Sequence, residues 1–181
     1  MRIIALDPGK KNFAAAVMED RKVVETRYLH PMKSLLWDDF ASEVKLFRDN
    51  YFEFLSEINP DCVLAERFMA RPGVMQGAVG EYVNIMLGII GVVNASKGVP
   101  THLVTSAQWK NALTARYGDM GSKGTRRWFP HLSVHEGDAL GIAVYAMEQE
   151  YPEEKGKLLN YVKRLRRYPH VGKAPDDKAK G

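Results

Sequence analysis

Cysteine is almost absent from this chain, which has one, Cys62, among 181 residues. A lone cysteine has no partner for an intrachain disulfide, which is typical of proteins from a reducing compartment, and its place in the apolar run CVLAERF predicts a core residue. Long hydrophobic runs are also missing. The longest, IMLGIIGVV at 85–93, is far shorter than the roughly 20 residues needed to cross a bilayer. Charged side chains interrupt residues 1–18, which therefore resemble neither a signal nor a transit peptide. We expect a soluble, cytoplasmic protein that makes no membrane contact.

Internal repeats are lacking too, and low complexity is confined to the terminal segment GKAPDDKAKG. A chain of this length fits one domain that buries roughly 70% of its unfolded surface, so neither disulfides nor a structural metal are needed to hold it together. The terminal segment has almost no apolar side chains to bury. We expect one folded domain over 1–150, followed by a basic extension over 151–181 that is partly disordered.

The net charge is only +4, but the basic side chains are unevenly distributed. Residues 97–131 carry 6 basic and 1 acidic side chains, and residues 151–181 carry 9 and 4. Basic blocks interleaved with aromatics, as in ARYGDMGSKGTRRWF and NYVKRLRRY, suit a polyanion such as DNA, because each neutralised phosphate releases counterions. A solvated helix face and an ordinary charged tail would have the same composition, so charge alone leaves both interpretations open.

Hydrophobic periodicity predicts alternating strands and helices. The opening apolar run and the segments NFAAAVMED and KVVETRYLH read as a three-stranded meander with a turn at Asp20 to Lys22. Apolar positions from Leu36 to residue 58 predict an amphipathic helix that ends at Asn59 and Pro60. A strand (CVLAERF), a loop (MARPG), a helix ending near Ser96 with Gly98 as its stop signal, and a fifth strand (THLVTS) follow.

The second predicted helix is unusually rich in glycine, and each glycine costs about 1 kcal/mol relative to alanine. Its small residues fall at spacings of three and four, which leaves one stripe nearly bare of side chains. The stripe predicts that another segment approaches closely, either from within the fold or from a second subunit or a nucleic acid. Its members are Gly77, Gly80, Asn84, Gly88, Gly91 and Ala95.

Carboxylates end two of the predicted strands. Asp7 ends the first, where Asp-Pro-Gly also has the composition of a turn with positive φ at Gly9. Glu66 ends the strand CVLAERF, and a buried strand rarely carries an acid unless that acid is paired. Two strands that end in acids weaken the turn interpretation of Asp7.

A third acid lies in the segment SVHEGDALGIAVYAM. Ser133 and Glu136 have the spacing of a capping box at the start of an apolar helix. His135 and Asp138 then share one face of the first turn, where the helix dipole favours an ionised Asp and a neutral His. A histidine in that place can equally be structural.

Three acids from two strand ends and a helix start match the oxygen ligands that Mg²⁺ prefers. Two such ions about 4 Å apart can hold the attacking and leaving oxygens of a phosphodiester. Together with the basic blocks, this combination indicates a nuclease.

The motifs ALDPG at 5–9, ERFMAR at 66–71 and HEGDALGIA at 135–143 resemble the three catalytic segments of RuvC-type Holliday junction resolvases. The resemblance covers about residues 1–148 and implies a ribonuclease H-like α/β fold, with a five-stranded mixed β-sheet flanked by α-helices. It also implies Mg²⁺, or Mn²⁺ in its place, with two ions per site, and a homodimer that makes paired cuts in four-way DNA. The implied metal ligands are Asp7, Glu66, His135 and Asp138.

The resemblance further implies DNA contacts. Two lysines near the scissile phosphate match Lys110 and Lys123, and an aromatic that stacks in the junction matches Phe68. One residue separates Glu66 from Phe68, where the family usually has two. Further candidate phosphate contacts are Arg71, Arg126 and Arg127.

Other functional classes would account for parts of this pattern. A sugar-kinase-like or actin-like ATPase would use Asp7 on a metal-bound nucleotide, but it needs two such domains, for which 181 residues leave no room. A non-catalytic branched-DNA-binding protein predicts the basic blocks but not three convergent acids. Another ribonuclease H-like nuclease, acting on other branched or hybrid substrates, would share the whole pattern.

Overall fold

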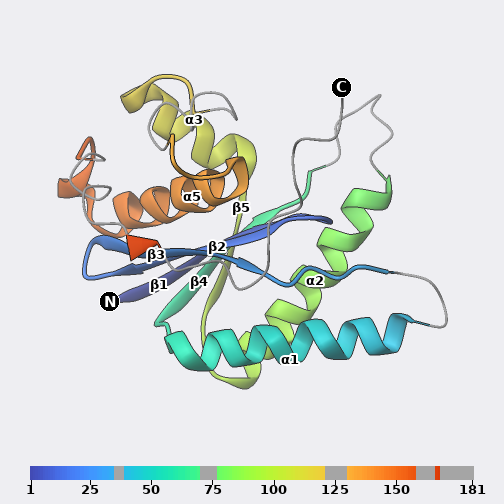
Figure 1. Cartoon of the computed structure of the whole chain (residues 1–181). Helices are drawn as coiled ribbons and strands as arrows, with labels where there is room; N and C mark the ends of the chain where they lie inside the picture. The colour runs from blue at the N-terminus through green and yellow to red at the C-terminus, as the bar shows by residue number, and fades with distance from the viewer. Residues whose placement is uncertain (35–38, 70–76, 121–129, 158–165, 168–181) are drawn as a thin grey trace.

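A mixed β-sheet with helices on both faces forms the protein in the computed structural model, which describes all residues except 35–38, 70–76, 121–129, 158–165 and 168–181 (Figure 1). The strands are β1 (Arg2–Pro8), β2 (Phe13–Glu19), β3 (Lys22–Leu29), β4 (Cys62–Arg67), β5 (Thr101–Thr105) and the short β6 (Arg166–Arg167). The helices are α1 (Phe40–Ile58), α2 (Gly77–Ser96), α3 (Ser106–Tyr117), α5 (Val134–Glu150) and the 3₁₀ turn η1 (Pro152–Glu154).

The strand order is β5-β4-β1-β2-β3-β6. β1, β2 and β3 pair antiparallel as the expected meander, whereas β4 and β5 run parallel to β1. The turn between β2 and β3 has positive φ at Asp20 and Arg21, as a two-residue type I′ hairpin requires. These strands confirm the predicted five-stranded mixed sheet, to which β6 adds two residues parallel to β3.

Each face of the sheet is covered by two helices. α1 and α2 cover one face, and α3 and α5 cover the other (Figure 1). The side chains of the strands alternate between the two faces, so each face has its own buried cluster. The candidate site lies on the α3 and α5 face.

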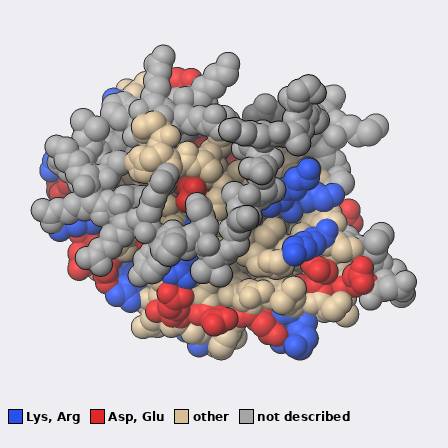
Figure 2. Space-filling view, in the orientation of Figure 1, with Lys and Arg blue, Asp and Glu red and all other residues tan. Residues whose placement is uncertain are grey.

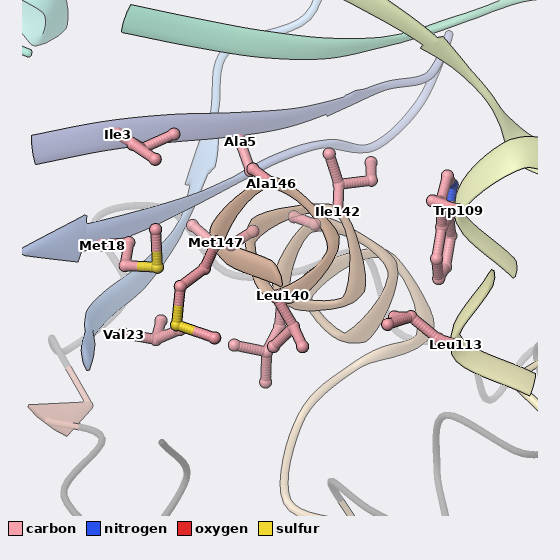
Figure 3. Close-up of a cluster of buried hydrophobic side chains, with 14 of the residues drawn as sticks. Ile3, Ala5, Met18, Val23, Trp109, Leu113, Leu140, Ile142, Ala146 and Met147 are labelled. Carbon is pink, nitrogen blue, oxygen red and sulfur yellow. The ribbon is translucent and has the colours of Figure 1, made fainter. Parts of the chain in front are cut away.

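Alanine dominates the contact between α5 and the sheet. Ala5, Ala14 and Ala16 of the strands belong to the same buried cluster as Ala143 and Ala146 of α5. Figure 3 shows Ala5 beside Ala146, with the larger side chains of this cluster arranged around the helix. Small side chains on both sides let the helix axis lie close to the strands.

The predicted helix ends agree with the structure. Asn59 caps α1 in the left-handed conformation, and Gly98, two residues after α2, has a φ of +68°. The first helix begins at Phe40, and the expected start at Leu36 lies outside the described residues. Gly9 corrects one expectation: it is not among the positive-φ residues, and a Cβ there would lie 2.6 Å from the Asn12 carbonyl oxygen. A close backbone approach, and not a positive φ, therefore explains this glycine.

The glycine stripe of α2 divides into two parts. A Cβ at Gly80 would lie 2.5 Å from the Phe68 ring, so this position packs tightly within the fold. A Cβ at Gly88 or Gly91 would meet nothing within 4 Å. The second half of the stripe is therefore open on the surface.

One stretch of α2, Val79–Ser96, is long and apolar enough to cross a membrane by length and composition alone. A core helix passes the same test, and Val83, Met86 and Ile90 of this stretch are buried in the cluster beneath the sheet. The stretch is weak evidence for a membrane span, and a cytoplasmic location stays a prediction.

Candidate active site

Asp7 and Glu66 lie side by side at the carboxyl ends of neighbouring strands. β1 and β4 run parallel with Leu6 opposite Ala65, so the next residue of each strand points to the α5 face at the same level. Asp7 is itself paired in the sheet, opposite Ala14. It is therefore a strand residue, and the turn alternative for it is wrong.

The N-terminus of α5 brings the other two candidates to this place. The predicted capping box is present: the Ser133 hydroxyl accepts from the Glu136 amide, and the Glu136 carboxylate accepts from the Ser133 amide. The Nδ1 atom of His135 lies 2.9 Å from Oδ2 of Asp7. Asp138 follows on the same helical face and is 8% exposed. The two strands and the helix therefore bring Asp7, Glu66, His135 and Asp138 together.

Two side chains of β3 hold this end of α5 in place. The Tyr28 hydroxyl donates to the Ser133 hydroxyl at 2.5 Å, and the Thr26 hydroxyl donates to the buried Glu136 carboxylate at 3.3 Å. These bonds tie the capping box to the sheet. The position of His135 and Asp138 is thus set by the strands as well as by the helix.

Helix α3 adds two donors next to each other in sequence. The Lys110 ammonium lies 3.0 Å from Oδ2 of Asp138, and the indole N–H of Trp109 donates to Oε2 of Glu66 at 2.7 Å. The predicted DNA contact Lys110 is therefore at the site itself. It offsets part of the negative charge that Asp7, Glu66 and Asp138 place together.

The environment raises the pKa of two of these acids. Burial raises the pKa of Glu66 to about 7, and the negative charges of Asp7 and Asp138 act in the same direction, while Trp109 and Lys110 oppose them. Burial is also the main reason why the pKa of Asp138 is raised, and the Lys110 charge opposes it. A carboxyl group such as Glu66, which gains a proton near neutral pH, is typical of sites built to receive cations or to move protons.

The donor set fits a hard divalent cation by its chemistry, because three carboxylates and one imidazole converge where the strands end. Within the described ranges, no three His, Cys, Asp or Glu side chains are already arranged to hold a metal ion. Asp7 is engaged by His135 and Asp138 by Lys110, so these contacts have to rearrange when a cation binds.

The predicted DNA-contacting residues are only partly described. Phe68 is half-buried with its ring against Gly80, and base stacking by this ring stays a prediction. The adjacent Met69 is 53% exposed. The remaining candidates lie outside the described residues, and they are Arg71, Lys123, Arg126 and Arg127.

Sequence reasoning missed two groups of contacts at the site. Trp109 had no motif to single it out, although the small Gly141 opposite it is a signal in retrospect. The β3 anchors Thr26 and Tyr28 could not be paired with α5 before the fold was known.

No protein-family model and no curated protein sequence matches the chain. Among solved structures, Thermus thermophilus RuvC in complex with a Holliday junction substrate is similar, with a TM-score of 0.58 and 23% identity over 83% of this chain and 95% of that one. A second Thermus thermophilus RuvC structure has a TM-score of 0.57 and 22% identity, covering 84% and 97%. The yeast mitochondrial Holliday junction resolvase Ydc2 has a TM-score of 0.53 and 13% identity, covering 88% and 86%. These similarities show that the fold is ribonuclease H-like.

Proposed function

We propose that this protein is a metal-dependent endonuclease that cuts four-way (Holliday) DNA junctions. The convergence of Asp7, Glu66 and Asp138 at one end of a ribonuclease H-like sheet carries the proposal. A binding module would need basic and aromatic surface but has no use for three partly buried carboxylates, which cost free energy to bring together. The likeness of the fold to solved junction resolvases supports the same conclusion.

The side chains of the site have separate roles in phosphodiester hydrolysis. Asp7, Glu66 and Asp138 are the proposed ligands of divalent cations, Mg²⁺ or Mn²⁺, with two ions per site. Such ions would supply charge neutralisation at the phosphate and a more acidic water molecule. His135 lies close enough to Asp7 to orient a water molecule or to accept its proton. Lys110 is free to turn to the scissile phosphate once Asp138 is engaged elsewhere.

Binding of the junction arms is assigned to the basic blocks. In Figure 2, Lys and Arg side chains form two adjoining groups on the right-hand side of the view, and others lie along its left and lower edges among Asp and Glu side chains. The resemblance supports contacts by Phe68, Lys110 and Lys123, and the further phosphate contacts proposed from the sequence are Arg71, Arg126 and Arg127. Phosphate contacts position the protein without reading base sequence, which suits an enzyme that recognises branched shape.

We further propose a homodimer that packs through α2. Val92 is 71% exposed, and the neighbouring Gly88 and Gly91 leave open space beside it. A bare helical stripe lets a second helix approach closely, and two copies would supply the two active sites that paired cuts require. The expected result for Val92→Glu is a shift to monomer by light scattering, with loss of paired cutting but not of single nicks.

Single-turnover cleavage of a synthetic four-way junction with Mg²⁺ tests the proposal. Asp7→Asn, Glu66→Gln and Asp138→Asn should each abolish cutting while junction affinity stays within a few-fold. Asp49→Asn, which changes an exposed carboxylate paired with Arg48, is the matched control and should cut normally. A wild-type chain that binds the junction but never cuts it, with either metal, would identify a non-catalytic binding protein. Preferential cutting of hybrid or other branched duplexes would identify a different ribonuclease H-like nuclease.

A further inference from the structure

Trp109 is the largest fully buried side chain of the described residues, and it ends at the active site. None of its surface is exposed. Its indole N–H donates to Oε2 of Glu66 at 2.7 Å, which joins an otherwise apolar cluster to a carboxylate of the site. Figure 3 shows the indole extending from α3 toward α5, above Leu113 of the same helix.

Gly141 of α5 makes room for this indole. A Cβ at Gly141 would lie 2.5 Å from Cζ3 of Trp109 and 3.0 Å from Cη2. Those distances are too short for any real Cβ, so only glycine lets α5 pass beside the ring in this position. The indole is therefore held between α3 and α5, and its N–H has a fixed direction.

We propose that Trp109 is a positioning residue that sets the orientation of the Glu66 carboxylate for cation binding. The indole has one N–H, so it occupies Oε2 of Glu66 and leaves Oε1 for a cation. A donor that is rigidly packed fixes its acceptor better than a mobile polar side chain does, and such supporting contacts commonly change metal affinity 10-fold or more, as an order of magnitude. The inference rests on the proposed function only in taking Glu66 as a cation ligand.

The alternative is a purely structural Trp109 whose N–H happens to need an acceptor. The two interpretations predict different results when the N–H is removed and the ring is kept. If Trp109 is only structural, removing its N–H should lower the melting temperature and leave the cation affinity unchanged. If Trp109 positions Glu66, removing its N–H should lower the cation affinity by more than the loss of stability explains.

Calorimetric titration of the full chain with Mn²⁺, in the absence of DNA, separates these outcomes. Trp109→Phe should raise the Mn²⁺ dissociation constant by about 10-fold, whereas Leu113→Val, a buried change one turn along the same helix, should lower the melting temperature without changing the constant. Gly141→Ala is the second variant, because it moves the indole without removing its N–H, and it should weaken Mn²⁺ binding in the same direction.

Fluorescence gives a readout independent of affinity. Replacing the other two tryptophans, Trp37 and Trp128, by phenylalanine leaves Trp109 as the sole emitter. Saturating Mg²⁺ should then shift its emission, and Glu66→Gln should abolish that shift. In junction cleavage, Trp109→Phe should raise the metal concentration for half-maximal rate more than it lowers the rate at saturation.

Several outcomes would overturn the inference. Wild-type Mn²⁺ affinity in Trp109→Phe, or a loss equal to that in Leu113→Val, would make Trp109 structural while leaving the nuclease proposal intact. A wild-type chain that binds no Mn²⁺ would refute the inference together with the metal site. Weakened Mn²⁺ binding in a protein that cuts no junction would uphold the role of Trp109 and refute the proposed activity.

Discussion

Replacing Glu66 by glutamine should stabilise the protein while abolishing cleavage. Burial raises the pKa of Glu66 from an ordinary value of 4.5 to about 7. The folded chain therefore keeps a proton that the unfolded chain has lost between these two pH values, and folding stability falls as pH rises through that window. At about 1.4 kcal/mol per pKa unit, the ionised group costs the fold about 3 kcal/mol above neutral pH.

Glutamine removes the charge and keeps an oxygen that can accept from the Trp109 indole. In a chelating buffer near pH 8, the variant should melt about 6 to 12 °C above wild type, given about 2 to 4 °C per kcal/mol for a chain of this size. About one pH unit below 4.5, where the carboxyl is mostly protonated in both states, the two proteins should melt together. Thermal unfolding followed by circular dichroism across this pH range measures the difference.

Glu57→Gln is the matched control, because it removes a carboxylate whose pKa is shifted in the opposite direction. The hydrogen bonds from Arg27 lower the pKa of Glu57, so its charge favours the fold and its loss should give no stabilisation at any pH. Saturating Mg²⁺ should reverse the order of wild type and Glu66→Gln, because only wild type retains the full ligand set. Equal melting of the two proteins near pH 8 in chelator, or a difference that does not change with pH, would refute the reasoning.

Substitutions at three further positions test other parts of the site and its support. His135→Ala should slow single-turnover cleavage on the order of 10²-fold. His135→Asp should retain activity with an altered preference between Mg²⁺ and Mn²⁺. An Ala variant as fast as wild type would mean that the histidine has only a structural role. Lys110→Ala should slow cleavage and reduce the slope of log affinity against log salt by about one, and an unchanged slope and rate would mean that no phosphate contact was lost. Glu148 is fully buried and accepts from the Tyr117 hydroxyl at 2.5 Å and from Arg116. Glu148→Ala should lower the free energy of unfolding by about 3 kcal/mol, because Arg116 loses its partner. An unchanged melting temperature in calorimetry would contradict this.

Local patterns in the sequence were enough to predict the strand ends and the start of α5. The apolar runs before Asp7 and Glu66 clearly indicate strands, and the Ser133 to Glu136 spacing is typical of a capping box. Since parallel neighbouring strands end at one edge, these patterns also place the acids together once the strand order is given. The resemblance implied a five-stranded mixed sheet, which the structure confirms, but the order of the strands within the sheet is known only from the structure.

Contacts between elements distant in sequence were not predictable from such patterns. Trp109 and Gly141 lie in different helices, and neither has a local signature that links it to Glu66. The glycine stripe of α2 predicted a close approach, but only the structure shows that Gly80 faces Phe68 and that Gly88 faces outward. Gly9 was assigned to a turn because Asp-Pro-Gly is a common turn composition, whereas its real constraint is a carbonyl group brought near by the following loop.

The alanines between α5 and the strands act as a spacer of fixed thickness. Ala16 and Ala143 touch neither the proposed cations nor DNA, yet they belong to the layer that sets how far the helix stands from β1. Each added methyl group would raise α5, because packed interiors have little free volume to absorb it. His135 and Asp138 would move with the helix, away from Asp7. Substitutions at exposed positions near the site are therefore expected to reduce activity less than the addition of a single carbon atom to one of these buried alanines.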